Sequence, residues 1–311
     1  MPPPLLSCIS ARIDLSGEPV VDGLNGESVG NSVGLIGPWG PLFRVLAAAG
    51  NVSSGCIRLG GHDAVAAVAT GSVGLALYEP GLPSRWSVSQ YLQASAQLTG
   101  LSKRGAETEA RSVLDRCQVS WLANAKLRDL PPVHQRLVVV LHATLGSPAI
   151  LALETPLLGL DEASQRQLAE AVGRAASERG LLLSVGQAAP GSVERSVLDT
   201  LDEVWVLRQG SVVARGPAAQ VLASANRYLV VVTRQAHRLA SALTDRETHV
   251  TLNSPELPEA AGPDSRTRGD ARAGRLIVDL EPNESTDVIV EAALEVKAPI
   301  VELRPLSVQS D

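Results

Sequence analysis

The chain has 311 residues, with 27 Lys plus Arg against 33 Asp plus Glu, and its formal net charge of −6 argues against a nucleic-acid-binding protein, which needs a basic face. Apolar residues make up 45% and charged residues 19%, which excludes a disordered chain, and the length favours two domains. Aromatic residues amount to only 3%, and Phe43 is the single phenylalanine, so Ala, Val and Leu must fill the cores.

Cysteine and histidine usage excludes two kinds of site. Cys8, Cys56 and Cys117 are odd in number and far apart, which leaves neither a disulfide framework nor a CxxC metal site and favours a reducing, cytoplasmic setting. Four histidines are scattered without ligand spacing, so no metal site is expected. They are His62, His142, His237 and His249.

Nothing in the sequence predicts a membrane segment. The first 15 residues have only a short, interrupted apolar patch without a basic region before it, so we expect no signal peptide. The longest apolar run, residues 64–69, is far shorter than the roughly 20 residues that a bilayer crossing requires. Any work at a membrane is therefore expected to go through a partner.

The first third of the chain predicts a strand, a tight loop and a helix. Residues 33–36 form an apolar run, residues 37–40 are rich in Gly and Pro, and residues 42–50 have a helical pattern that ends at Gly50. Residues 56–59, before two glycines, predict another strand. Apolar residues at helical spacing over 86–127, with a second helix near 107–117, predict a helical insert.

Strands and helices then alternate, which predicts a parallel α/β core. Pro131-Pro132 is expected to break the chain before a helix resumes at Gln135. The predicted elements are a helix over 135–145, a strand over 149–153, a helix over 164–179, a strand over 181–184 and a hairpin over 204–207 and 211–214.

The pattern changes after about residue 224 and predicts a small α+β domain. Its expected elements are strands at 228–233, 276–280 and 301–303, helices at 237–243 and 287–294, and a flexible, charged loop over 253–274. The predicted domains are therefore residues 1–224, with the helical insert at about 86–145, and residues 225–311.

Five short segments follow one another in an order and spacing that are specific together: residues 34–40, 79–82, 145–148, 159–161 and 202–210. Their order resembles the ATP-binding subunit of an ABC transporter, in the ABC-2 branch of drug- and gliding-type exporters. The resemblance spans nearly the whole chain and implies an α/β fold of the P-loop NTPase type, with a helical insert and a small C-terminal α+β domain.

The family's phosphate loop, GxxxxGK[ST], uses glycines to wrap phosphates, a lysine to neutralise them and a hydroxyl to ligate magnesium. Counted without gaps from Gly37, the second glycine falls on Leu42, the lysine on Phe43 and the hydroxyl on Arg44. A rescue of the lysine by Arg44 stays open. The degenerate loop consists of Gly37, Pro38, Trp39, Gly40, Pro41, Leu42, Phe43 and Arg44.

The resemblance also implies an aspartate that orders magnesium and a glutamate that polarises water, both after an apolar strand. Glu154 and Thr155 stand there. Glu154 still has reach to a cation, although a solvated carboxylate is the favoured interpretation. Thr155 cannot take a proton from water at neutral pH, so the catalytic base is expected to be absent.

The remaining family positions are also changed, with one exception. The LSGGQ signature becomes Leu130, Pro131, Pro132, Val133 and His134, in which the prolines remove backbone donors and glycine-only conformations. The glutamine of the Q-loop falls on Tyr78 and the switch histidine on Gly186. The loop that crosses the family's dimer interface is retained as Gly159, Leu160 and Asp161.

The sequence therefore predicts a catalytically inactive ATPase-like subunit that is structural or regulatory in an export complex. Its expected partners are an ABC-type permease, an active ATP-binding homologue or both, as a homo- or heterodimer at the inner face of the cell membrane. No cofactor is expected, with ATP and Mg²⁺ only if residual binding survives. Two alternatives stay open: an ATP-binding subunit with residual hydrolysis, and a cytoplasmic adaptor unrelated to transport.

Overall fold

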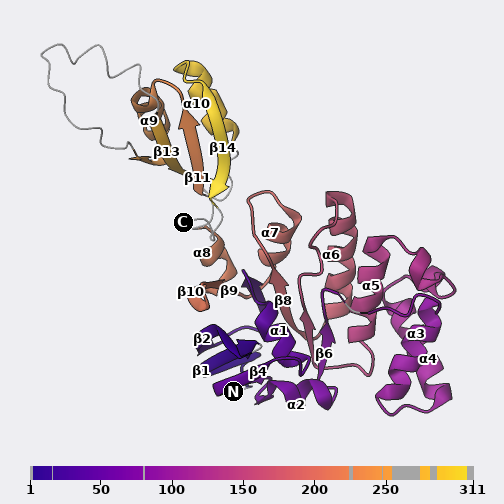
Figure 1. Ribbon diagram of the computed structural model, residues 1–311. Coiled ribbons are helices and arrows are strands. Elements are labelled where there is room, and N and C mark those ends of the chain that lie inside the picture. Colours follow the sequence, from indigo (N-terminus) through magenta and orange to yellow (C-terminus); the bar gives the residue numbers. More distant parts are fainter. Residues whose placement is uncertain are drawn as a thin grey trace, which may run out of the picture. The chain divides into compact units, whose positions relative to one another are not determined.

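The structure, a computed structural model, describes residues 3–15, 17–79, 81–223, 227–246, 248–253, 274–280 and 286–306 (Figure 1). The chain divides into two compact units, Met1–Val221 and Leu222–Asp311. The flexible loop expected over 253–274 lies, apart from its two end residues, outside the described residues.

A six-stranded sheet forms the centre of the first unit, with the order β10-β9-β3-β8-β7-β6. All neighbouring pairs are parallel except β10 with β9. Every residue of β7 and β8 is buried, as in parallel sheets covered on both faces. The strands are β3 (Ser32–Ile36), β6 (Val73–Ala76), β7 (Ile150–Leu153), β8 (Gly180–Val185), β9 (Glu203–Arg208) and β10 (Ser211–Pro217).

A second, antiparallel sheet with the order β2-β1-β4-β5 was largely missed by the sequence prediction. Ser10 has a φ of +44°, and the register of β1 against β4 shifts between Ile9 and Arg12. Such bulges interrupt the alternation of apolar and polar residues that marks a strand. The strands are β1 (Leu6–Leu15), β2 (Glu18–Glu27), β4 (Asn51–Leu59) and β5 (His62–Asp63).

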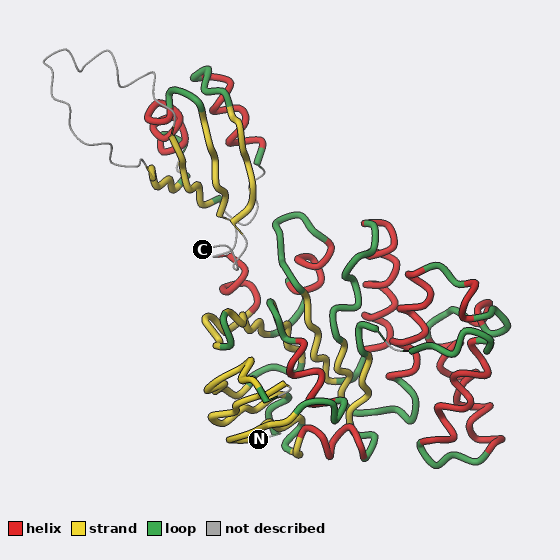
Figure 2. Tube along the Cα trace, viewed as in Figure 1, coloured by secondary structure: helices red, strands yellow, loops and turns green. Residues whose placement is uncertain are grey.

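Helices surround the central sheet, and α3 and α4 pack against each other as the predicted helical insert (Figure 2). Ser87 begins α3 with a capping box, in which Ser87 Oγ accepts from Gln90 N and Gln90 Oε1 accepts from Ser87 N. The helices are α1 (Gly40–Leu46), α2 (Ala64–Ala69), α3 (Val88–Leu98), α4 (Lys103–Arg116), α5 (Pro132–Ala143), α6 (Glu162–Ala176), α7 (Val193–Leu198) and α8 (Ala218–Ala223), with short 3₁₀ turns η1 (Ser120–Leu122) and η2 (Leu127–Asp129).

The second unit has one antiparallel sheet with the order β12-β13-β11-β14, in the chain order βαββαβ. This is the split β-α-β arrangement, with a core that includes Val230, Leu239, Leu276 and Ile289. Its elements are β11 (Arg227–Val232), α9 (Ala236–Thr244), β12 (His249–Asn253), β13 (Gly274–Asp279), α10 (Asp287–Glu295) and β14 (Ile300–Leu306). In neither unit is a described helix long and apolar enough to cross a membrane.

Candidate functional site

The loop after β3 is short and is filled by its own tryptophan. Gly37, with a φ of +110°, turns the chain after Ile36 and donates its N–H to Val185 O at 3.0 Å. The Trp39 side chain is buried and donates its Nε1–H to Ile36 O at 3.0 Å. Helix α1 then begins at Gly40, so the loop between β3 and α1 consists of Gly37, Pro38 and Trp39.

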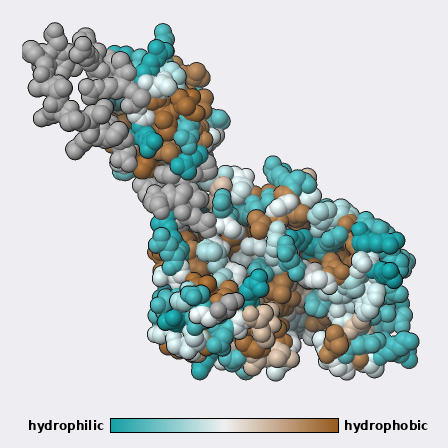
Figure 3. Space-filling view, viewed as in Figure 1, coloured by the Kyte–Doolittle hydropathy of each residue, from teal (hydrophilic) through white to brown (hydrophobic). Residues whose placement is uncertain are grey.

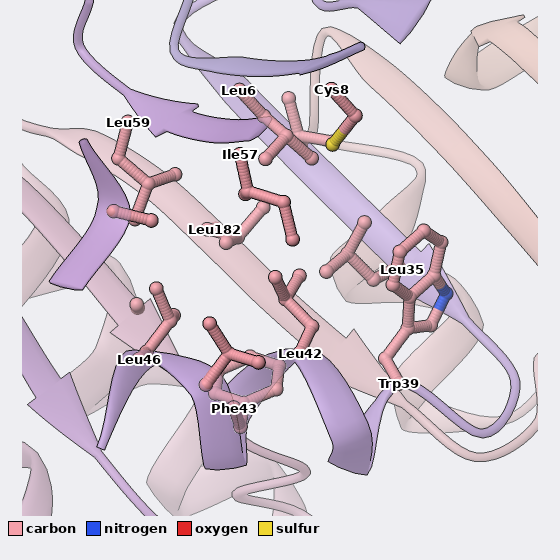
Figure 4. Packing of buried hydrophobic residues seen from close by; sticks show 14 of the residues in the cluster. Leu6, Cys8, Leu35, Trp39, Leu42, Phe43, Leu46, Ile57, Leu59 and Leu182 are labelled. Carbon is pink, nitrogen blue, oxygen red and sulfur yellow. The ribbon is translucent and has the colours of Figure 1, made fainter. Parts of the chain in front are cut away.

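The first turn of α1 packs against the hydrophobic core. Leu42 and Phe43 are fully buried and pack in one cluster with Trp39 and Leu46 (Figure 4). Phe43, which the count without gaps places at the phosphate-binding lysine, has its side chain in the core beneath α1. Arg44 and Pro38 are exposed, and Pro41 is half-buried.

Glu154 lies beside the start of α1. Its Oε2 accepts the backbone N–H of Tyr78 at 3.0 Å, and a Cβ built on Gly40 would lie 3.6 Å from its Oε1. Glu154 is thus half-buried and hydrogen-bonded, and the expectation of a merely solvated carboxylate is wrong. A carboxylate at this point is attracted by the positive end of the helix dipole, and its negative charge would repel a phosphate bound there.

Thr155 begins a turn after β7, in which its carbonyl oxygen accepts the N–H of Leu158 at 3.2 Å. It has a φ of +37° and donates its backbone N–H to Ser184 Oγ at 3.0 Å. The loop after it includes Gly159, Leu160 and Asp161, and Asp161 caps α6 by accepting Ser164 N at 3.0 Å. Hydrogen bonds from Ser164 hold the pKa of Asp161 below its usual value. Gly186 is half-buried at the end of β8.

Pro131 and Pro132 begin α5, and the expectation that they break the chain before Gln135 is wrong. Pro131 is the N-cap and Pro132 the first helical residue, where the missing N–H costs nothing and the fixed φ is already helical. The N–H groups of His134 and Gln135 both donate to Pro131 O.

His134 packs against an exposed tryptophan. Its ring makes an edge contact with Trp121, with ring centroids 5.0 Å apart, and burial lowers its pKa. Its Nε2 lies 3.5 Å from Gln167 Nε2. Leu130 is buried in the same stretch, at the end of η2.

The sequence analysis did not predict one contact near Tyr78. The guanidinium of Arg136, on α5, lies over the ring of Tyr78 with its Cζ 3.8 Å from the ring centroid. Gly159 lies near the hydroxyl of this tyrosine, since a Cβ built on it would be 3.7 Å from Tyr78 Oη. No sequence pattern indicated the contact of Tyr78 with Arg136, because the two residues are 58 positions apart.

Solved structures settle the fold of the first unit. CbiO1 of Clostridium perfringens, part of the ABC transporter complex CbiONQ, matches with a TM-score of 0.60 at 18% identity, over 71% of this chain and 91% of that one. A nucleotide-free ATP-binding cassette of an ABC transporter matches with a TM-score of 0.59 at 15% identity, over 71% and 95%. The fold is that of an ABC ATP-binding cassette. The predicted fold class is thereby confirmed.

Sequence relatives of this cassette chain are ATP-binding proteins of ABC transporters. The Nod factor export ATP-binding protein I of Neorhizobium galegae is 27% identical over 210 residues, which are 65% of this chain and 59% of that protein. The molybdenum import ATP-binding protein ModC of Mesorhizobium japonicum is 27% identical over 207 residues, 63% and 54%. The chain thus spans little more than half the length of these two relatives. No family model matches the chain.

The cassette's described residues do not fit Mg-ATP. Trp39, Leu42 and Phe43 fill the space under the short loop, and no lysine stands between Gly37 and Arg44. Glu154 is the one carboxylate at the family's magnesium position, and its neighbour is a threonine. In the part of the chain that the structure describes, no group of three His, Cys, Asp or Glu residues is placed to hold a metal.

Proposed function

We propose that this chain is a cassette subunit that neither binds nor hydrolyses ATP and that acts as a structural or regulatory partner in a membrane export complex of the ABC-2 type. The observation that carries the proposal is the closed loop after β3, with Trp39 and Phe43 buried below it. A loop that is packed with its own side chains leaves no room for phosphates among its backbone N–H groups.

The proposed partners are a permease subunit, an active ATP-binding homologue or both. The relatives' names include export and import proteins, so the export branch rests on the small C-terminal unit and the order of motifs. The cassette would act at the cytoplasmic face and reach the membrane only through its partner, as a homo- or heterodimer. The retained residues Gly159, Leu160 and Asp161 support pairing with a second cassette.

Two alternatives compete with this proposal. An ATP-binding subunit with residual activity agrees with the relatives' names and would rely on Arg44 and Glu154. A cytoplasmic adaptor would need a uniformly charged surface over the insert. Against the adaptor stands an apolar groove beside α3, although Trp86, which is 43% exposed, is not among its lining residues. The surface in Figure 3 is mixed in hydropathy.

The test is calorimetric titration of the full chain with millimolar Mg-ATP, together with an assay of phosphate release. We expect no heat of binding and no turnover. Turnover that is abolished by Glu154→Ala, with Glu162→Ala as an exposed control on α6, would refute the proposal in favour of an active ATPase.

A further inference from the structure

In the described part of the second unit, helices cover one face of the antiparallel sheet. Helices α9 and α10 share one core with alternate residues of the strands, among them Val230 and Leu276. Because successive side chains of a strand point to opposite faces, the residues between these core positions belong to the other face. Three half-buried apolar residues of that other face lie outside the core: Leu229 and Val231 of β11 and Ile277 of β13.

The strand register arranges this second face in rows. Two neighbouring rows cross β14, β11 and β13, which are adjacent strands of the sheet. They are Arg304, Leu229 and Ile277 in one row and Glu302, Val231 and Arg275 in the next. We call these six residues the open face. In both rows an apolar residue stands on the middle strand, and a charged residue stands beside it on β14.

The second row carries opposite charges on the two sides of its centre. Arg275 and Glu302 are both exposed, and each lies one strand away from Val231, which is about 4.8 Å. Among the described residues, Arg275 has no ion-pair partner, whereas Glu302 pairs with Arg304 at 2.8 Å. The row is therefore complementary in charge to a second copy of itself that is rotated by a half-turn about β11.

A two-fold axis parallel to β11, between two facing sheets, uses this complementarity. It places Arg275 of each copy over Glu302 of the other copy. Leu229 and Val231 then meet their own counterparts at the centre, which buries apolar surface as in sheets that pack face to face. An axis across the strands through Leu229 would instead place Arg304 against itself, and like charges directly opposite each other are destabilising.

The size of the open face sets the expected strength of this contact. Three strands about 4.8 Å apart and about 20 Å long give a footprint of roughly 300 Å² on each copy. A standard protein interface buries about 800 Å² on each partner, so we expect a weak dimer with a Kd of roughly 10 to 100 µM. A contact of this size adds to any other contact between the same two chains.

We propose that the open face is an interface between two copies of this chain, with two symmetric ion pairs between Arg275 and Glu302 around an apolar centre. The inference goes beyond the proposed function, because it assigns a partner surface to the second unit. It does not depend on whether the cassette binds ATP.

The test is sedimentation velocity of the full chain from about 5 to 500 µM, which brackets the expected Kd. Arg275→Glu and Glu302→Arg each put like charges opposite each other twice in a dimer, so each should weaken dimerisation at least about tenfold. An equimolar mixture of the two variants should dimerise like the wild-type chain, because the mixed dimer has opposite charges at both contacts. Arg111→Glu, a charge reversal at an exposed position of α4, should change nothing.

Three results would overturn the inference. They are a wild-type chain that stays monomeric over the whole range, dimerisation that is equal for the wild-type chain and both variants, and a mixture that dimerises as weakly as each variant alone. Because both reversed residues are exposed, thermal unfolding should show that the variants stay folded. Titration with Mg-ATP tests the inactive-cassette proposal separately.

Discussion

Phe43 is fully buried, and its ring belongs to the core beneath α1. We expect Phe43→Ala to lower the free energy of unfolding by about 3–5 kcal/mol, through lost burial and a cavity. Arg44→Ala, at the exposed neighbour, should change it by no more than about 0.5 kcal/mol. Urea unfolding followed by tryptophan fluorescence measures both, and equal effects would contradict the packing of Phe43.

His142 supplies a pH dependence that can be measured. Burial lowers its pKa below the ordinary 6.5, so the folded chain resists a proton that the unfolded chain takes up. Stability should therefore rise with pH from the lowered pKa up to about 6.5 and fall as the pH drops through that window. His142→Gln should flatten this dependence in pH-series unfolding curves, whereas His62→Gln, at an exposed position, should preserve it. His134, whose pKa is also lowered, should leave a smaller residual slope.

Individual residues also show why the candidate site could be predicted only in part from the sequence. The predicted losses at Thr155 and at the two prolines rest on side-chain chemistry alone and stay predictions. The burial of Phe43 could not be predicted, because the replacement of a lysine by a phenylalanine does not tell where the ring points. The structure shows that Leu42 and Phe43, in the first turn of α1, are buried in the core.

At the scale of elements, the close contact of α5 with β6 gives a sharp prediction. A Cβ on Gly74 of β6 would lie 1.7 Å from the carbonyl oxygen of Ala143, at the end of α5. Gly74→Ala must push the helix from the sheet, so we expect a loss of about 1–3 kcal/mol or more in thermal or urea unfolding.

Gly173 is the matched control within α6. A Cβ built there meets nothing within 4 Å, and the residue is exposed inside the helix. Gly173→Ala should stabilise the protein by about 0.5–1 kcal/mol, because alanine loses less backbone entropy in a helix. If both alanine variants shifted stability alike, α5 would not approach β6 as closely as the structure has it.

Elements with clean periodicity were the predictable ones. Buried apolar runs gave β3, β7 and β8 within a residue or two, and the 3.6-residue pattern gave α6 and α10. The strands β1 and β2 were missed, since bulges and polar residues break their alternation. The proline pair was misinterpreted because proline both ends and begins helices, and only the tertiary contacts of α5 decide between the two.

At the scale of the whole molecule, the cassette fold is present while the loop after β3 is packed with apolar side chains. Backbone hydrogen bonds between the strands and buried apolar side chains hold the central sheet together, and neither depends on a ligand at the loop after β3. Trp39 and Phe43 bury apolar surface in the cassette core, at a place where a phosphate loop would contact solvent and ligand. This buried surface stabilises the fold. If the proposed function is right, we expect the cassette to be stable without nucleotide.

The two units have separate hydrophobic cores, and this makes a prediction for the chain as a whole. The core around Phe43 and the core around Leu239 share no residue, and each lies inside one unit. Leu239→Ala should destabilise its own unit by about 2–5 kcal/mol and speed amide exchange in α9, β11 and β13. Phe43→Ala should instead speed exchange in α1, β1 and β4. Hydrogen exchange read by mass spectrometry assigns each effect to its peptides, and exchange that accelerates across both units in either variant would show that they unfold as one cooperative body.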